Sequence, residues 1–368
     1  MREVFEVEAA SENGCTQLTL PAAPYAMLDA LERLRLEPGE TPRWELLKSY
    51  DAWHIYQYMD QEDGSLADLN ALAQRLALLK DQEFAIIEGL AAMEPGPLGQ
   101  SIPLSRLIDM AYSTDCCHLV EGVVTDAQLG RFCAESGFVP GADSLTGEMF
   151  ELLDFERIGK QFGEAEGGVF TRGGYVQRRE ELKQVYKTLD FTPKKPDYTM
   201  LAELPDGSRI KLPTPPGKTM ADEPAQCVDC ATPSLTGLTA MLSTLDMLAR
   251  RMVELEVDGE LTKYKALLEA VHCQDMIQAL TLADGLDQYT FSPKLLEPED
   301  VAFECLRTML PGNEVELLTP YLDLPRYGQA VLDQTDGLLT SHGMIQRTDD
   351  QPVQTMDQET ESNEMEMM

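Results

Sequence analysis

The sequence predicts an α+β protein, with small acidic α/β modules in an elongated array in the N-terminal half and a mainly α-helical C-terminal half. Three observations lead to this prediction. The first 20 residues alternate apolar and polar side chains as strands do, and several later segments repeat apolar side chains at helical spacing. The composition also changes near residue 177, and a length of 368 residues allows two or three domains.

The N-terminal segment predicts a β-hairpin followed by a helix. Phe5, Val7 and Ala9 fall on one face of a strand, with glutamates on the other, and Glu12-Asn13-Gly14 makes the turn. Leucines then recur at helical spacing after Pro24, a residue that suits the first turn of a helix. These elements indicate a small α/β module.

Two further helices are indicated by their capping residues. Ser65 and Asp68 form a capping box ahead of a stripe of leucines that continues to residue 79. Thr125 and Gln128 begin the second helix, and Gly137 ends it at a position suited to left-handed backbone. Acidic residues dominate both regions, so we expect many carboxylates on their solvent faces.

A glycine-rich segment from residue 152 to 176 raises the question of a phosphate-binding loop. Such a loop needs converging backbone amides and usually a lysine, whereas this segment places Glu164 and Glu166 among its glycines. A short strand near residues 169–171, bracketed by the turns Gly167-Gly168 and Gly173-Gly174, is the better interpretation.

Residues 177–223 predict a basic helix that continues into a proline-rich linker. The basic stretch of residues 172–197 is called the joint here and separates two acidic blocks. Residues 1–171 and 198–368 each hold 30 acidic and 11 basic residues, whereas residues 172–197 carry a net charge of +3. We expect the basic side chains of the joint to fold back onto the acidic faces, because that field attracts them first.

The second half predicts an α-helical domain over residues 224–347, with helical periodicity from 235 to 257, from 261 to 286 and from 298 to 310. Residues 348–368 are polar and acidic, which predicts a disordered tail.

Charge and composition narrow the function. The net charge of −35 disfavours direct contact with nucleic acid or anionic membranes and favours basic partners. No apolar run approaches the roughly 20 residues that span a bilayer, and the N-terminus does not resemble a signal peptide. We therefore expect a cytoplasmic protein.

Candidate catalytic and metal-binding residues are few. Cys227 and Cys230 form a lone CxxC, and Cys116-Cys117-His118 lies too far away in sequence to be paired with it by spacing. A metal- or thiol-dependent enzyme that uses these cysteines stays an alternative. Because no histidine lies in a recognised catalytic motif, we expect a protein without enzymatic activity and without cofactor or metal.

Four segments in order, FEVEAASENGCTQLTLP, SLADLNALAQRL, VVTDAQLGRFCAESGFVPG and LLDFERIGKQFGEAEGGVFTRGGYV, carry a family resemblance. Over about residues 3–176 the chain resembles the ArdA-type antirestriction proteins of mobile genetic elements. The family's LN-L helix corresponds to Leu69-Asn70-Ala71-Leu72, and its next helix to Leu129–Phe132 with Glu135. Its aromatic-acid element corresponds to Asp154-Phe155-Glu156 with Gly159, and its closing strands to residues 168–175. Family members are about half this length, and long acidic forms are associated with conjugative elements of Firmicutes.

The resemblance implies about three small modules in residues 1–176, a homodimer, and a DNA mimic that occupies the DNA-binding groove of type I restriction-modification enzymes. The carboxylates expected to face that partner are Asp51, Asp60, Glu62, Asp63, Asp68, Glu83, Asp109, Asp115, Glu121, Asp126, Glu135, Asp143, Glu148, Asp154 and Glu156.

The charge is sufficient for mimicry. B-DNA carries about two negative charges per base pair, so the 30 carboxylates of residues 1–171, doubled in a dimer, match about 30 base pairs. Two alternatives stay open: an acidic interaction adaptor of a conjugative element, with the helical half as its working part, and acidity that serves solubility alone.

Overall fold

The structure is a computed structural model that describes residues 2–50, 55–60, 63–94, 101–217, 221–310, 314–349 and 351–353. The chain forms two compact units. The first unit comprises residues 1–22 and 30–193, and the second comprises residues 23–29 and 194–368. The first unit therefore continues 17 residues beyond residue 176 (193 minus 176), and helix α1 (Pro24–Leu34) supplies residues to both units.

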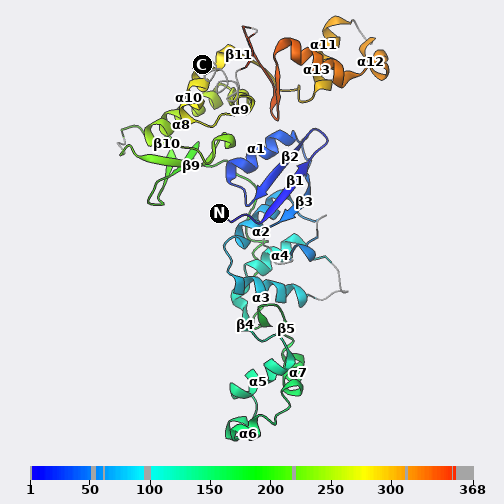
Figure 1. Cartoon of the computed structure of the whole chain (residues 1–368), viewed down its shortest axis with the longest axis vertical. Helices are drawn as coiled ribbons and strands as arrows, with labels where there is room; N and C mark the ends of the chain where they lie inside the picture. Colours follow the sequence, from blue (N-terminus) through cyan, green and yellow to red (C-terminus); the bar gives the residue numbers. More distant parts are fainter. Residues whose placement is uncertain are drawn as a thin grey trace, which may run out of the picture. The chain divides into compact units, whose positions relative to one another are not determined.

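The first unit begins with an antiparallel sheet of strand order β2-β1-β3. Its strands are β1 (Phe5–Ala10), β2 (Cys15–Leu20) and β3 (Arg43–Ser49). Phe5, Val7 and Ala9 are fully buried, which confirms the predicted alternation of the first strand. The strands are drawn in blue in Figure 1.

A group of helices follows this sheet. Its members are the short 3-10 helix η1 (Ile55–Gln57) and the helices α2 (Leu66–Leu76), α3 (Asp81–Ala92) and α4 (Leu104–Ala111). The predicted capping box of α2 is confirmed, since Ser65 and Asp68 satisfy each other's backbone amides. This middle part of the unit is helical rather than α/β, because its apolar residues recur at helical spacing and bury α2 against α4.

The last part of the first unit pairs two helices with a small sheet of order β4-β6-β5. Its elements are η2 (Thr114–Cys116), β4 (Cys117–Glu121), α5 (Asp126–Glu135), η3 (Ala142–Ser144), α6 (Gly147–Phe150), α7 (Phe155–Glu166), β5 (Val169–Phe170) and β6 (Gly174–Arg178). Thr125 caps α5 as predicted, and β5 lies where the glycine pairs indicate a strand. Helix α7 occupies residues that were interpreted only as a glycine-rich segment.

The predicted basic helix after residue 177 is wrong. Residues 179–199, all of which the structure describes, contain no helix. Their backbone amides are bonded to the first unit instead: the amide of Lys183 donates to Ser113 Oγ at 2.9 Å, and that of Tyr186 donates to Asp109 Oδ1 at 2.8 Å. Tertiary hydrogen bonds thus replace the helical ladder that the local sequence favours.

The second unit begins with an antiparallel sheet of order β10-β9-β7-β8. Its strands are β7 (Met200–Glu203), β8 (Arg209–Leu212), β9 (Pro224–Cys230) and β10 (Thr239–Met241), with η4 (Pro233–Leu235) before the last. The expected linker at 198–223 thus contributes two strands. Its proline-rich part, including residues 213–217, forms no helix or strand.

Helices occur over most of the stretches that the periodicity of the second half predicts, but the start of the first stretch is wrong, because Thr239–Met241 forms strand β10. These helices are α8 (Leu242–Val257), α9 (Leu261–Ala270), α10 (Met276–Asp284) and α11 (Pro298–Met309). The remaining elements are η5 (Leu286–Gln288), β11 (Tyr289–Ser292), α12 (Glu314–Leu318), η6 (Thr319–Tyr321), α13 (Leu324–Thr335), β12 (Leu338–Thr340) and β13 (Gly343–Arg347). Two sheets therefore accompany the helices of this half, so the whole chain is α+β.

The first residues of the predicted disordered tail are packed against the second unit. The amide of Thr348 donates to the Gln288 carbonyl at 2.9 Å, and Val353 is buried in the core of this unit. Residues 354–368, which make up most of the predicted tail, lie outside the described residues. No helix within the described ranges is long and apolar enough to cross a membrane.

The second unit repeats the topology of the first. Each unit has a sheet in which a hairpin pairs with a third strand, then three longer helices, then a strand, a helical pair and a closing hairpin. The repeat departs at two points: α1 lies between β2 and β3 without a counterpart between β8 and β9, and the second sheet has a fourth strand, β10. The closing sheets have the orders β4-β6-β5 and β11-β13-β12, and α11 packs on α13 as α5 packs on α7 (Figure 1).

The register of the sheets supports this correspondence. The pairing of β1 with β3 is interrupted between Glu6 and Val7, the second and third residues of β1. The pairing of β7 with β9 is interrupted between Leu201 and Ala202, again the second and third residues of the strand. A bulge at the same point of two sheets is a retained feature rather than a coincidence of topology.

Residues at the helical pairs also correspond, at a constant separation of 169 positions (323 minus 154). The matching pairs are Asp154 and Asp323, Arg157 and Arg326, Gly159 and Gly328, Thr171 and Thr340, Gly174 and Gly343, and Arg178 and Arg347. Gly174 and Gly343 share a positive φ of 147° and 145°. The chain therefore contains two copies of one fold.

Candidate functional site

The structure assigns a fold-stabilising role to two of the predicted partner-facing carboxylates. Asp68 and Asp109 are each only 9% exposed. Asp68 accepts hydrogen bonds from the amide and hydroxyl of Ser65 at 2.8 and 2.7 Å, and Asp109 accepts from the Tyr186 amide at 2.8 Å. These two residues cannot present a charge to a partner, because their oxygens are buried and bonded.

Three more of these carboxylates satisfy backbone amides at or near helix N-termini. Asp63 accepts from the Leu104 amide at 3.2 Å, Glu83 from the Lys80 amide at 3.0 Å, and Asp154 from the Arg157 amide at 3.1 Å. Each therefore supplies an acceptor that the first turn of a helix needs.

Another group is held by neighbouring side chains. Lys183 contacts Asp115 at 2.6 Å, and this hydrogen bond lowers the pKa of the Asp115 carboxyl. Arg131 contacts Glu135 at 3.5 Å. Gln82 donates to Glu121 at 2.6 Å. The contact of Lys183 confirms the expectation that basic residues of the joint fold back onto acidic faces.

The carboxylates that remain accessible cluster at the helical pair of the first unit. Asp143, Glu148 and Glu156 are exposed and have no hydrogen-bond or ion-pair partner among the described residues. Asp126 and Asp60 are half-buried. The two remaining predicted residues, Asp51 and Glu62, lie outside the described residues.

Acidic residues of the first sheet carry further charge and were not predicted as site residues. Glu8 of β1 lies directly opposite Glu45 of β3 in the antiparallel register. Like charges at directly opposed positions destabilise a sheet. The alternation of apolar and polar residues in β1 could have identified the acidic residues of this strand from the sequence, since it places Glu6 and Glu8 on the outward face.

The second unit contains a buried polar network that the sequence did not indicate. Asp29 accepts from Lys265 Nζ at 2.7 Å and from His342 Nε2 at 3.1 Å, and His342 Nδ1 lies 3.2 Å from Glu269 Oε2. Burial alone would raise the pKa of Asp29, but the hydrogen bond from His342 and the charge of Lys265 outweigh it and hold that pKa well below its usual range.

The same network raises the question of a serine nucleophile, because Ser341 Oγ lies 3.2 Å from His342 Nδ1. Burial would lower the pKa of His342, but its hydrogen bonds to Asp29 and Glu269 raise it. An imidazole flanked by two carboxylates holds protons on both nitrogens and cannot accept one from a serine. The Ser341 hydroxyl donates instead to Glu269 Oε2 at 2.6 Å. We interpret the network as a balanced set of buried charges.

The two cysteines of the CxxC are inaccessible to a substrate, because Cys227 and Cys230 are completely buried in the core of the second unit. The hydrogen bond between them together with burial raises the pKa of Cys227 far above its usual range. Burial would raise the pKa of Cys230 as well, but its hydrogen bonds to Cys227 and Thr232 lower it. Burial raises the pKa of Cys117 to about 11. Thiols with raised pKa values are poor nucleophiles. Within the part of the chain that the structure describes, no group of three acidic, cysteine or histidine side chains could hold a metal ion.

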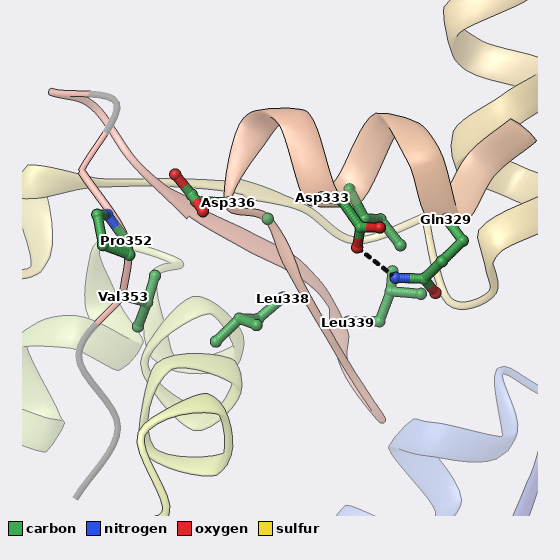
Figure 2. Close-up of a pocket in the computed structure, with 9 residues that line it drawn as sticks. Gln329, Asp333, Asp336, Leu338, Leu339, Pro352 and Val353 are labelled. Carbon is green, nitrogen blue, oxygen red and sulfur yellow. Dashed lines mark hydrogen bonds between the residues drawn. The ribbon is translucent and has the colours of Figure 1, made fainter. Parts of the chain in front are cut away.

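One cavity of about 340 Å³ lies beside β12 and the C-terminal end of α13 (Figure 2). Leu338, Leu339, Pro352 and Val353 supply its apolar wall. The only labelled pair joined by a hydrogen bond is Gln329 and Asp333, at 2.8 Å. The lining offers few converging polar groups, so the cavity resembles a gap under the chain end more than a substrate site.

Comparison with known proteins adds no family to these observations. No protein-family model matches the chain, and no curated protein is significantly similar to it. The functional conclusion therefore depends on the geometry and charge of the chain and on the resemblance described above.

Proposed function

We propose that this protein is a non-enzymatic mimic of DNA that inhibits type I restriction-modification enzymes by occupying their DNA-binding groove. It would thereby protect a mobile element when that element enters a cell. The partner is a basic DNA-binding protein, and the chain needs no cofactor. The observation that carries the proposal is the set of exposed carboxylates Asp143, Glu148 and Glu156, which lie on η3, α6 and α7, within residues 1–171, which carry 30 acidic residues.

Fixed carboxylates can replace phosphates for physical reasons. A groove that binds DNA is lined by cations, and anions held on a folded scaffold meet those cations without any cost of bending a duplex. Unpaired carboxylates on the protein surface keep their charge available, whereas paired ones do not. The opposition of Glu8 and Glu45 fits this interpretation, because it sacrifices stability to keep charge on an outer face.

The test is direct. The protein in excess is mixed with a purified type I restriction-modification enzyme, and both DNA cleavage and DNA binding are measured at about 50 and about 200 mM salt. We expect inhibition at low salt that weakens steeply at the higher salt, since contacts between charges are screened. Undiminished cleavage and DNA binding at low salt would contradict the proposal.

The alternative of an adaptor, with the second half as a separate working part, is less well supported. The second unit repeats the topology of the first, and residues 198–368 carry the same excess of acidic residues as residues 1–171. Two copies of one fold with one kind of charge are more simply explained by one kind of partner.

A further inference from the structure

The two units share an unusual surface feature at the helical pair. In the first unit Met149 and Leu152 are 54% and 84% exposed, and in the second unit Leu318 and Tyr321 are 42% and 85% exposed. The two members of each pair lie five and two residues before the aspartate that caps the next helix, Asp154 or Asp323. Within each pair the residues are three positions apart, and each pair spans the end of a short helix, α6 or α12.

Exposed apolar side chains that occur singly need no explanation. Two such side chains retained at matching positions in both copies do need one, because the intervening sequence has changed in length and composition. The stretch from the start of α11 to the start of α13 is three residues shorter than the stretch from the start of α5 to the start of α7, yet both exposed positions stay large and apolar. Because the two exposed positions stay apolar while the sequence between them and the preceding helix changes, we interpret them as contacts with a partner.

Exposed carboxylates lie close in sequence to each pair. Glu148 and Glu156 lie near Met149 and Leu152, and Glu314 and Glu316 lie before Leu318 and Tyr321. A cavity of about 470 Å³, lined mainly by apolar groups that include Leu322, opens next to this second pair.

From these observations we infer that each unit carries a protein-docking surface, with Met149 and Leu152 or Leu318 and Tyr321 as an apolar anchor flanked by exposed carboxylates. The occupant is a basic protein surface with an apolar depression. This inference rests on the proposed function and deepens it, because it names the side chains that grip the partner and gives one chain two such surfaces.

The charge of these carboxylates selects the partner. Two copies that met through this surface would bring like charges together, so a homodimer would form through another part of the chain. A basic partner gains from the same carboxylates. Central apolar side chains inside a polar rim are also the arrangement in which a few residues dominate affinity.

The experiment uses the full chain and three pairs of substitutions. Met149→Ser with Leu152→Ser removes the first anchor, and Leu318→Ser with Tyr321→Ser removes the second. Met247→Ser with Ile277→Ser is the control, because these side chains are 57% and 64% exposed, whereas the corresponding positions of α2 and α4 are the buried Ala71 and the polar Ser105. All these positions are solvent-exposed, so folding should be little affected, and thermal melts check this.

The probe is a purified type I restriction-modification enzyme, and affinity is measured at two salt concentrations. We expect each anchor pair to weaken binding about ten- to a hundredfold, and by a similar factor at both salt concentrations, since apolar contacts are not screened. The control should bind within about twofold of the unmodified chain, as expected for apolar side chains outside the interface.

Three results are informative. If the unmodified chain does not bind the enzyme, the proposed function itself fails. If the unmodified chain binds and the anchor variants bind like the control, only the anchor inference is overturned. If sedimentation shows that the anchor variants lose self-association while enzyme binding is unchanged, the surface is a contact between copies and the inference is likewise overturned.

Discussion

Asp154 and Asp323 hold the same position in two copies of one fold: each carboxylate accepts a hydrogen bond from the amide three residues later, at 3.1 and 3.2 Å. They begin α7 and α13, the second helices of the two helical pairs. A residue that caps a helix in both copies has a structural reason to be acidic. The comparison of the copies therefore separates carboxylates that hold the fold from those that are free to bind a partner.

The first prediction concerns these caps. Asp154→Ala and Asp323→Ala should each lower the free energy of unfolding by about 1 kcal/mol, because an amide of the first helical turn loses its acceptor. Denaturant unfolding followed by circular dichroism measures the change.

The matched control is Asp143→Ala, since Asp143 is exposed and its carboxylate has no partner among the described residues. Its unfolding free energy should stay within about 0.5 kcal/mol of the unmodified chain, while its binding to a restriction enzyme weakens. Equal stability losses at Asp143 and Asp154 would contradict the division of roles.

The second prediction concerns the contact between paired helices. A Cβ at Gly159 would lie 1.8 Å from the Asp126 carbonyl oxygen, and one at Gly328 would lie 1.6 Å from that of Pro298. Gly159→Ala and Gly328→Ala should therefore each destabilise the protein by about 3 kcal/mol, because the backbones must separate. Gly147→Ala is the control, since a Cβ there meets nothing within 4 Å. If all three variants melt alike, the close packing of the helices is not as described.

Much of the fold could be predicted from local patterns. The hairpin at residues 5–20, the capping box at Ser65 and the helices of the second half follow from alternation, caps and periodicity. Helix α7 was missed because its four glycines in and beside residues 155–168 lower helix propensity, and two of them serve helix packing and termination instead. The basic segment after residue 177 was wrongly predicted to be a helix, because tertiary hydrogen bonds override its local preference for helix.

The duplication was also missed, for a physical reason. The two copies share residues that the backbone requires, such as Gly174 and Gly343 with their positive φ, and few others. These positions are scattered over a separation of 169 residues (343 minus 174), while the intervening surface has changed freely. Topology and register make the relation visible because they do not depend on surface residues.

The candidate site was only partly predictable. Sequence alone shows that carboxylates are abundant, but it cannot show which of them are buried, as Asp109 is, or capping a helix, as Asp154 is. The network around His342 was invisible for a simpler reason. Asp29 and His342 are 313 residues apart, and no local motif connects them.

The third prediction uses the pH dependence of that network. The pKa of His342 is raised in the folded state, so its contribution to stability is complete below its unfolded pKa of about 6.5. The contribution is lost as pH rises through the folded pKa. The pKa of Asp29 is lowered, so its contribution is already complete at neutral pH. We expect the unfolding free energy of the second unit to be lower at about pH 9 than at about pH 6.

The control for this prediction is His342→Gln. It removes the titrating group, so the part of the pH dependence that belongs to His342 should disappear. The variant should also lose about 3 kcal/mol at low pH, because Asp29 and Glu269 lose a charged partner in a buried position. Denaturant titrations of both proteins at the two pH values provide the comparison. An unchanged pH dependence in the variant would show that other groups cause it.

The fourth prediction concerns the opposed glutamates of the first sheet. Glu45→Lys should raise the unfolding free energy by about 0.5 kcal/mol, because a repulsion with Glu8 becomes an attraction. The same change should weaken binding to a restriction enzyme if the outer face of the sheet contributes to mimicry. Glu45→Gln should show a smaller gain in stability. A loss of stability in both variants would mean that the two side chains do not repel each other.

The fifth prediction concerns the segment 23–29, which belongs to the second unit although it precedes most of the first. Tyr25 is only 6% exposed, its hydroxyl donates to the Tyr198 carbonyl at 2.6 Å, and its amide lies 3.3 Å from Asp229 Oδ1. Tyr25→Ala should destabilise the second unit by about 3 kcal/mol or more, as expected for a buried aromatic residue. Tyr321→Ala, at an 85% exposed position, should leave stability nearly unchanged.

The same packing predicts the behaviour of fragments. A fragment of residues 198–368 lacks Tyr25 and Asp29, so the core loses an aromatic side chain and Lys265 and His342 lose a buried carboxylate. We expect it to be less stable than the second unit in the whole chain, and a synthetic peptide of residues 23–29 to restore part of the loss by mass action. Cooperative unfolding of the fragment at the same denaturant concentration as the whole chain, with no response to the peptide, would show that this segment is dispensable. Binding tests on that fragment therefore need a stability measurement beside them, because lost binding would otherwise be confused with lost folding.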